Sequence, residues 1–154
     1  MNCKVTTTCY SLLVSVALCI SIVGCATTED SYTLTYLKAS AEAGEVVAQR
    51  TLGIRYYKGK EVPQDYKEAA KWFRLSAEQG DAFAQTSLGK MYYDGNGVKQ
   101  DKVYAYMWWN IAASLGHKLS VKARDKFVKS MTQAQLTKAQ QLARACVKKH
   151  YKGC

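Results

Sequence analysis

The chain has 154 residues, a single proline and a formal net charge of +10 at pH 7, and this length has room for one domain. The charge is uneven: residues 26–101 hold 10 basic and 11 acidic side chains, whereas residues 102–154 hold 11 basic and one acidic. A basic C-terminal module on a neutral body suits an anionic lipid surface, an acidic glycan or an acidic protein patch.

The first 25 residues predict a targeting segment. Lys4 supplies a positive start, and the stretch from Tyr10 to Val23 is apolar apart from three serines. This stretch is shorter than the roughly 20 apolar residues that a membrane-spanning helix needs. We therefore expect a secretory signal peptide over residues 1–25.

The end of that segment, Ile22-Val23-Gly24-Cys25, resembles the bacterial lipobox. The resemblance implies that Cys25 is lipidated and becomes the first residue, and that several acyl chains anchor the protein in a membrane. Ala26 after the cysteine implies the outer membrane, so the expected location is the periplasm or the outer membrane. The alternative is an ordinary signal peptide that is cleaved after Ala26. Because export leaves little nucleic acid to bind, we do not expect a nucleic-acid partner.

The cysteines divide into two groups. Three lie within the signal segment, Cys25 is assigned to the lipid, and Cys146 and Cys154 remain as thiols in an oxidising compartment. One continuous helix would hold these two about 12 Å apart, which is too far for a disulfide, whose Cα atoms lie roughly 4.4–6.8 Å apart. A disulfide therefore requires the helix to end near Tyr151 and turn back, as Gly153 permits. The alternative is two unpaired or intermolecular thiols.

The body of the chain repeats at a period of 36 residues. Positions 48–80 align without a gap on positions 84–116 and share 14 of 33 residues. A fixed period of this length predicts a solenoid, in which each unit buries its apolar face against the next. The predicted segments are a polar tether at 26–34, a partial unit at 31–44, full units at 45–80 and 81–116, and a C-terminal cap at 117–150.

Each full unit predicts two antiparallel helices, A and B. Their expected bounds are 45–58 and about 65–79 in the first unit, and 82–94 and 101–115 in the second. Asp65 with Glu68 predicts a capping box at the start of the first helix B. In the cap, Thr132 with Gln135 predicts a second capping box, which begins a long final helix.

The repeated pattern closely resembles the Sel1-like repeat, a tetratricopeptide-like helical hairpin. The matching residues are Ala48, Leu52, Gly53, Tyr56, Gly59, Val62, Asp65, Ala69, Trp72, Ala77 and Gly80, and again their counterparts 36 residues on. The resemblance implies an all-α, right-handed solenoid over residues 31–150 with a C-terminal capping helix. It also implies a role as an adaptor or scaffold for other proteins at the bacterial cell envelope.

One cysteine-rich branch of that family is associated with penicillin binding and carries Ala-Cys-x7-Cys pairs. Ala145-Cys146 and Gly153-Cys154 have this spacing, although the earlier repeats lack such cysteines. The alternative function is therefore a protein that binds peptidoglycan or a β-lactam, or a related hydrolase.

In tetratricopeptide-like solenoids the helices A line the concave groove. Three sets of positions point into it when the Leu-Gly pair is used to align the units. They are Arg50, Thr86 and Lys122; Ile54, Lys90 and Lys126; and Tyr57, Tyr93 and Lys129. Tyrosine and arginine are favoured at interfaces, and rows of lysine favour an acidic protein partner. The alternative is that the tyrosines are packing residues and the lysines a solvated face.

Catalysis has little support in the sequence. Cys146 and His150 are four residues apart and could share a helical face, but two ligands do not make a structural zinc site. The chain has neither a nucleophile elbow nor a phosphate-binding loop. We therefore expect no enzyme activity, no catalytic residue, no cofactor and no metal.

Overall fold

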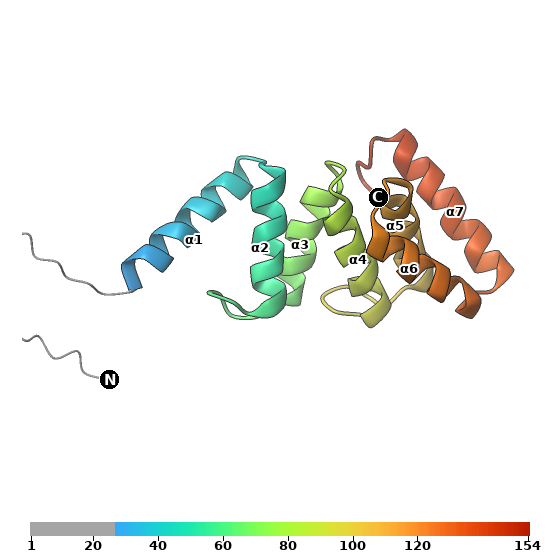
Figure 1. Cartoon of the computed structure of the whole chain (residues 1–154), viewed down its shortest axis with the longest axis horizontal. Coiled ribbons are helices and arrows are strands. Elements are labelled where there is room, and N and C mark those ends of the chain that lie inside the picture. Colours follow the sequence, from blue (N-terminus) through green and yellow to red (C-terminus); the bar gives the residue numbers. More distant parts are fainter. Residues whose placement is uncertain (1–26) are drawn as a thin grey trace, which may run out of the picture.

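The structure is a computed structural model that describes the backbone of residues 27–154 and the side chains from residue 33 onward. Within this part every regular element is helical, and no strand occurs. The elements are α1 (Thr27–Glu42), α2 (Val46–Lys58), α3 (Tyr66–Ala77), α4 (Ala82–Asp94), α5 (Lys102–Ser114), α6 (Lys118–Phe127), the 3₁₀ turn η1 (Val128–Ser130) and α7 (Gln133–Lys148) (Figure 1).

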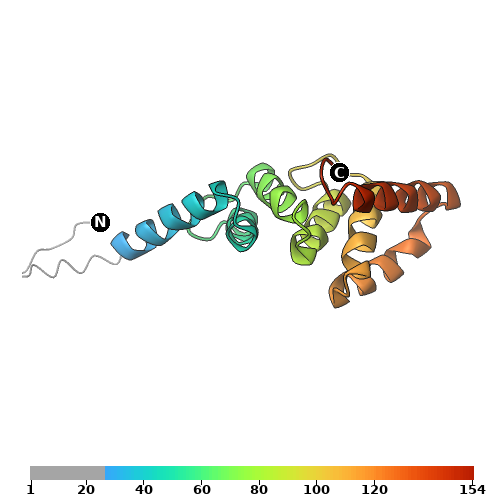
Figure 2. The ribbon, with the colours of Figure 1, turned by 90° about the horizontal axis from the view of Figure 1, so that it is seen from above.

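The helices follow one another along the long axis of the molecule, from α1 at one end to α7 at the other (Figure 1). We call α2 with α3 repeat 1 and α4 with α5 repeat 2; in each, the first helix is helix A and the second is helix B. The view from above shows α1 leading away from the other helices (Figure 2). This order of hairpins confirms the predicted all-α solenoid.

Local sequence signals explain where the helices start and stop. Gly59 and Gly95 end the two helices A with φ of 67° and 77°, a left-handed conformation that glycine adopts without steric cost. Asp65 and Asp101 cap the two helices B, because each carboxylate accepts hydrogen bonds from two backbone amides. The two repeats therefore fold into the same hairpin.

The core runs through both repeats and into the final helix. Phe73, Leu88 and Trp108 are almost completely buried in one cluster that Cys146 of α7 joins. Each large apolar side chain buried in this way stabilises the fold by about 1.5–3 kcal/mol. The solenoid is thus closed at its C-terminal end by α7.

A glycine in each helix A lets helix B approach closely. A Cβ atom at Gly53 would lie 2.8 Å from the Phe73 ring, and one at Gly89 would lie 2.5 Å from the Trp109 ring. Both distances are shorter than a Cβ atom tolerates, so only glycine fits. The Leu-Gly pair of the repeat therefore sets the contact between helices A and B.

Two sequence predictions are corrected. Helix α1 already begins at Thr27, so most of the segment predicted as a tether at 26–34 is helical. Asp65 caps α3 but forms no capping box with Glu68. The backbone amide of Asp65 instead donates its hydrogen bond to the Tyr56 carbonyl, 3.0 Å away. The capping box of Thr132 and Gln135 is present at the start of α7.

The C-terminal turn folds back from α7 onto repeat 1. Cys146 and Cys154 form a disulfide with a Cα–Cα distance of 5.6 Å, because α7 ends at Lys148 and the chain then reverses. The Gly153 amide donates a hydrogen bond to Glu78, with an N–O distance of 3.2 Å. The turn therefore ties the last helix to the end of α3.

The predicted signal peptide at 1–25, with the lipidation site at Cys25, lies outside the described residues. Among the helices that the structure describes, none combines the length and apolar character needed to span a bilayer.

Candidate functional site

A cavity of about 580 Å³ opens between α4 and α6. Its volume falls within the range of about 300–1,000 Å³ that is typical of ligand sites. Helix α5 closes one side with Trp109. The lining residues are Phe83, Thr86, Ser87, Lys90, Tyr93, Trp109, His117, Leu119, Ala123, Lys126, Phe127 and Ser130.

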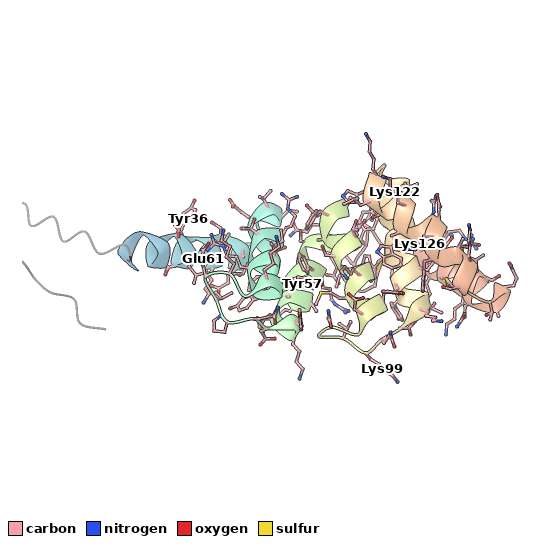
Figure 3. All side chains as sticks on the ribbon, turned by 60° about the horizontal axis from the view of Figure 1, so that its bottom comes forward. Tyr36, Tyr57, Glu61, Lys99, Lys122 and Lys126 are labelled. Carbon is pink, nitrogen blue, oxygen red and sulfur yellow. A yellow bond between two sulfur atoms is a disulfide. The ribbon has the colours of Figure 1, made fainter. Side chains whose placement is uncertain are left out.

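A second, smaller cavity of about 180 Å³ lies between α2 and α4. It is lined by Ile54, Tyr57, Lys58, Phe73, Phe83, Ser87 and Lys90. Phe83, Ser87 and Lys90 line both cavities. The two cavities therefore adjoin across α4, and we call them together the helix-A groove. Figure 3 labels Tyr57 at the repeat 1 end of this groove and Lys126 on α6 at the other end.

The two cavities lie at equivalent positions of the repeat. Six lining residues of the small cavity have a counterpart 36 positions later in the lining of the large one. The pairs are Ile54 and Lys90, Tyr57 and Tyr93, Phe73 and Trp109, Phe83 and Leu119, Ser87 and Ala123, and Lys90 and Lys126. The sequence repeat therefore produces a pocket at the junction of α2 with α4 and again at the junction of α4 with α6.

Aromatic side chains form one wall of the large cavity. The ring centroids of Tyr93 and Trp109 lie 5.2 and 5.3 Å from that of Phe127, in edge-to-face contacts. Trp109 is held in place because its indole nitrogen donates to the Thr86 carbonyl at 3.2 Å. Tyr93 nevertheless remains 46% exposed, and Phe83 remains 40% exposed. The wall thus presents fixed aromatic surface to the solvent, which favours contact with an apolar group.

Three polar side chains join α4 to the start of α6. The Nδ1 atom of His117 lies 2.9 Å from the Thr86 hydroxyl and 3.2 Å from the Ser120 hydroxyl. Ser120 is fully buried, and the Thr86 hydroxyl also contacts the Ala82 carbonyl at 2.6 Å. These hydroxyls already have partners within the protein, so the cluster fixes the spacing of the cavity walls and does not expose a nucleophile.

The charged residues of the groove are lysines. Lys90 pairs with Asp94, and this hydrogen bond raises the pKa of Lys90 above its ordinary value, against a smaller opposing effect of desolvation. Lys90 is therefore cationic at neutral pH. Among the described residues, no salt bridge engages Lys58 or Lys126. None of the residues that line either cavity is acidic.

The structure brings together most of the residues predicted for the groove. Ile54, Tyr57, Lys90, Tyr93 and Lys126 line one or both cavities. Arg50, Lys122 and Lys129 line neither cavity.

Each of these three exceptions has a structural reason. Arg50 forms a salt bridge with Asp81 at 2.8 Å and lies over the Phe83 ring. Lys129 falls in η1, because α6 ends at Phe127, and is therefore no longer on a helix A. Lys122 is exposed on α6 but does not reach the cavity.

The large cavity also contains residues that the sequence did not predict for the groove. They are Phe83, Trp109, Leu119, Phe127 and His117, the last of which is the N-cap residue of α6. One signal was present: Phe83 and Leu119 occupy equivalent positions 36 residues apart. Adding this fourth set to the three sets aligned above would have assigned Phe83 and Leu119 to the groove. Within the described residues, no three histidine, cysteine or acidic side chains gather at a place that could hold a metal.

Comparison with known proteins identifies the repeat. The family model described as Sel1 repeat matches residues 46–81 and 82–117, in agreement with repeats 1 and 2. A solved protective antigen of uropathogenic Escherichia coli, which displays an SLR fold, is 32% identical over 83% of this chain, with a TM-score of 0.72. A solved Sel1 repeat protein from Oxalobacter formigenes is 40% identical over 62% of this chain, with a TM-score of 0.61.

A curated relative, the secretory immunoglobulin A-binding protein EsiB of Escherichia coli O6:H1 (strain CFT073), is 49% identical over 41 residues, or 27% of this chain. The chain spans 8% of that protein, and 31% and 28% of the two solved ones. The relatives are therefore much longer than this chain, and the likeness covers the repeats and not a whole relative.

Proposed function

Because the chain carries two Sel1 repeats and is a Sel1-repeat protein, we propose that it is a protein–protein interaction scaffold at the bacterial cell envelope and binds its partner in the helix-A groove. The observation that carries the proposal is the aromatic cavity between α4 and α6, which holds exposed Tyr93, Phe83 and Leu119 beside two lysines.

The composition of this surface supports binding to a protein. Exposed apolar groups that cluster, instead of lying singly, mark interaction sites on soluble domains. Leu119 is 61% exposed, and it faces the same cavity as Phe83 and Tyr93. Aromatic residues are enriched in the cores of protein interfaces, and lysines at the rim favour encounter with an acidic partner.

The comparisons support the same class of ligand. Proteins with Sel1 repeats are in general interaction scaffolds without catalytic activity. The name of the Escherichia coli relative records a protein ligand, secretory immunoglobulin A. A protein ligand for this chain agrees with both, and we assign no catalytic residue.

The proposed place is the periplasm or the outer membrane, reached by export and held by a lipid on Cys25. Cys25→Ser should release the chain into the soluble periplasmic fraction, because the acyl chains that anchor it would be lost. Membrane association that is unchanged in this variant would contradict lipidation as the anchor.

Site-specific photo-cross-linking tests the groove. A photoreactive amino acid placed at Ser87, which lines both cavities, should form a discrete adduct with an envelope protein in living cells. The control is Leu75, which is exposed on α3, more so than the half-buried Ser87, but lines neither cavity. The same adduct from both positions, or from Leu75 alone, would place the binding face elsewhere. If neither position captures a protein, saturable binding of peptidoglycan fragments or a labelled β-lactam would favour the alternative function.

A further inference from the structure

We propose that the two cavities are adjoining subsites for one ligand: an extended, acidic segment of a partner protein that places a large apolar side chain, best an aromatic one, in the cavity between α4 and α6. This inference rests on the proposed function and specifies the chemistry of the partner.

The continuity of the two cavities points to an extended ligand. Phe83, Ser87 and Lys90 belong to both linings, so nothing but their own side chains separates the subsites. A compact small molecule would be held by one cavity alone. A polypeptide segment can cross α4 and occupy both, and it then gains contact area at each junction between repeats.

The larger subsite is suited to an aromatic anchor. At the position of Phe73 in repeat 1, repeat 2 has Trp109, whose ring forms an edge-to-face pair with Phe127 at a centroid distance of 5.3 Å. On the opposite side the cavity is bounded by Ala123 and Leu119 of α6, and Leu119 stands where the other subsite has the larger Phe83. The volume of about 580 Å³ accommodates a large side chain together with its backbone.

The charge of the groove selects an acidic segment. Lys58, Lys90 and Lys126 belong to the linings of successive junctions, and no lining residue is acidic. Lys126 and Lys58 make no salt bridge in the described part of the chain, so their charges are available to a ligand. Arg50 and Lys90 are already paired, with Asp81 and Asp94, so the free charges among the described residues of the groove are those of Lys58 and Lys126. Carboxylates that flank the aromatic anchor would therefore meet lysines on either side of it.

The test uses the full-length chain and short fluorescein-labelled peptides rich in glutamate with one central phenylalanine. Binding, followed by fluorescence anisotropy, should saturate and weaken as the salt concentration rises. Replacing the phenylalanine by alanine, or the glutamates by lysines, should weaken binding by about tenfold or more, since either change removes one of the two kinds of contact.

Two matched double variants locate the site. Lys90→Glu with Lys126→Glu should weaken binding of the phenylalanine peptide by about tenfold or more. Lys122→Glu with Lys129→Glu makes the same change of net charge beside the cavity without touching its lining, and should weaken binding by less than about twofold. Far-UV circular dichroism confirms that both variants are folded. Equal losses in both would mean that the peptide responds to net charge alone, and this would overturn the inference.

A steric variant gives an independent reading. Ala123→Trp fills the large cavity from α6, so it should abolish the advantage of the phenylalanine peptide over its alanine control. An advantage that survives in this variant would contradict the assignment of the anchor.

The outcomes separate this inference from the proposed function. A cross-link from Ser87 to an envelope protein, without binding of the acidic peptide, would overturn the ligand chemistry and leave the scaffold intact. Specific binding of the peptide without any cross-link in cells would support the subsites and count against the scaffold at the envelope.

Discussion

Repeats 1 and 2 have the same backbone and different surfaces. The residues that they share make the same internal contacts: Gln49 and Gln85 donate to the carbonyls of Ala41 and Ala77, 3.1 and 3.2 Å away. Most of the groove positions differ between the repeats, as where repeat 1 has Ile54 and repeat 2 has Lys90, whereas Tyr57 and Tyr93 are shared. The shared buried residues therefore hold the fold, and the lining positions that differ are free to specify a ligand.

The difference also changes the size of the pocket. The junction of α2 with α4 leaves about 180 Å³, whereas the junction of α4 with α6 leaves about 580 Å³. The third unit departs from the repeat, and its helix α6 is shorter than the two helices A before it. A regular solenoid would repeat one small pocket, and the irregular last unit opens a larger one.

The largest effect should come from the tryptophan that both helices B share. Trp108 is completely buried in the central core, whereas Trp72 is 7% exposed in the small cluster beside α1. We expect Trp108→Ala to lower the free energy of unfolding by about 3–5 kcal/mol, because it leaves a large cavity. Trp72→Ala should cost less, because its surroundings can relax toward the N-terminal end. Urea unfolding measures both, and equal losses would contradict the distinction between the two clusters.

The sequence could predict the hairpins because their signals are local. Gly59, Gly95, Asp65 and Asp101 end or begin helices through contacts with residues a few positions away, and the 36-residue period repeats them. The groove was predicted only in part, because its walls come from all the elements from α2 to η1. Trp109 lies on helix B and reaches the cavity only because Gly89 lets the helices approach so closely. The Leu-Gly pair marks the close approach, but no local pattern shows which side chain of helix B then reaches the cavity.

The ends of the two repeats also differ in what covers them. A Cβ atom at Gly80 would lie 3.3 Å from the Tyr151 ring, whereas nothing lies within 4 Å of one at its counterpart Gly116. The disulfide holds Tyr151 there. Cys154→Ala should therefore lower the free energy of unfolding by about 2–3 kcal/mol, in line with the loss of a small closed loop.

A reducing agent should produce the same loss in the wild-type chain and no further loss in the Cys154→Ala variant. If the variant is as stable as the wild-type chain, the turn adds nothing to the closure of the solenoid.

The loops between helices A and B offer a third contrast. Gly97 and its counterpart Glu61 both have left-handed φ, of 69° and 65°. Gly97 lies against repeat 1, where a Cβ atom would be 2.1 Å from the Tyr66 carbonyl oxygen. We expect Gly97→Ala to cost about 2 kcal/mol, from the left-handed conformation and the displaced loop.

At the other loop, Glu61→Gly relieves the backbone but removes the salt bridge to Arg55. The two effects oppose each other, so the thermal midpoint of this variant should stay close to that of the wild-type chain. A large loss from Glu61→Gly would show that the ion pair, and not the backbone, determines the loop of repeat 1.

The smallest effect concerns Lys90, which replaces the apolar Ile54 of repeat 1. Its pair with Asp94 is a solvent-exposed pair within one helix, so Lys90→Met should lower the free energy of unfolding by no more than about 0.3–0.5 kcal/mol at pH 7 and low salt.

The pKa of Lys90 is raised above 10.5 in the folded state by this hydrogen bond with Asp94. The stabilisation is therefore complete below that value and is lost as the pH rises through the folded pKa. The difference in the free energy of unfolding between the wild-type chain and Lys90→Met should therefore vanish above the folded pKa. A difference that persists there would show that the pair with Asp94 is not its source, because Lys90 is then uncharged whereas methionine keeps a side chain of similar length and apolar character.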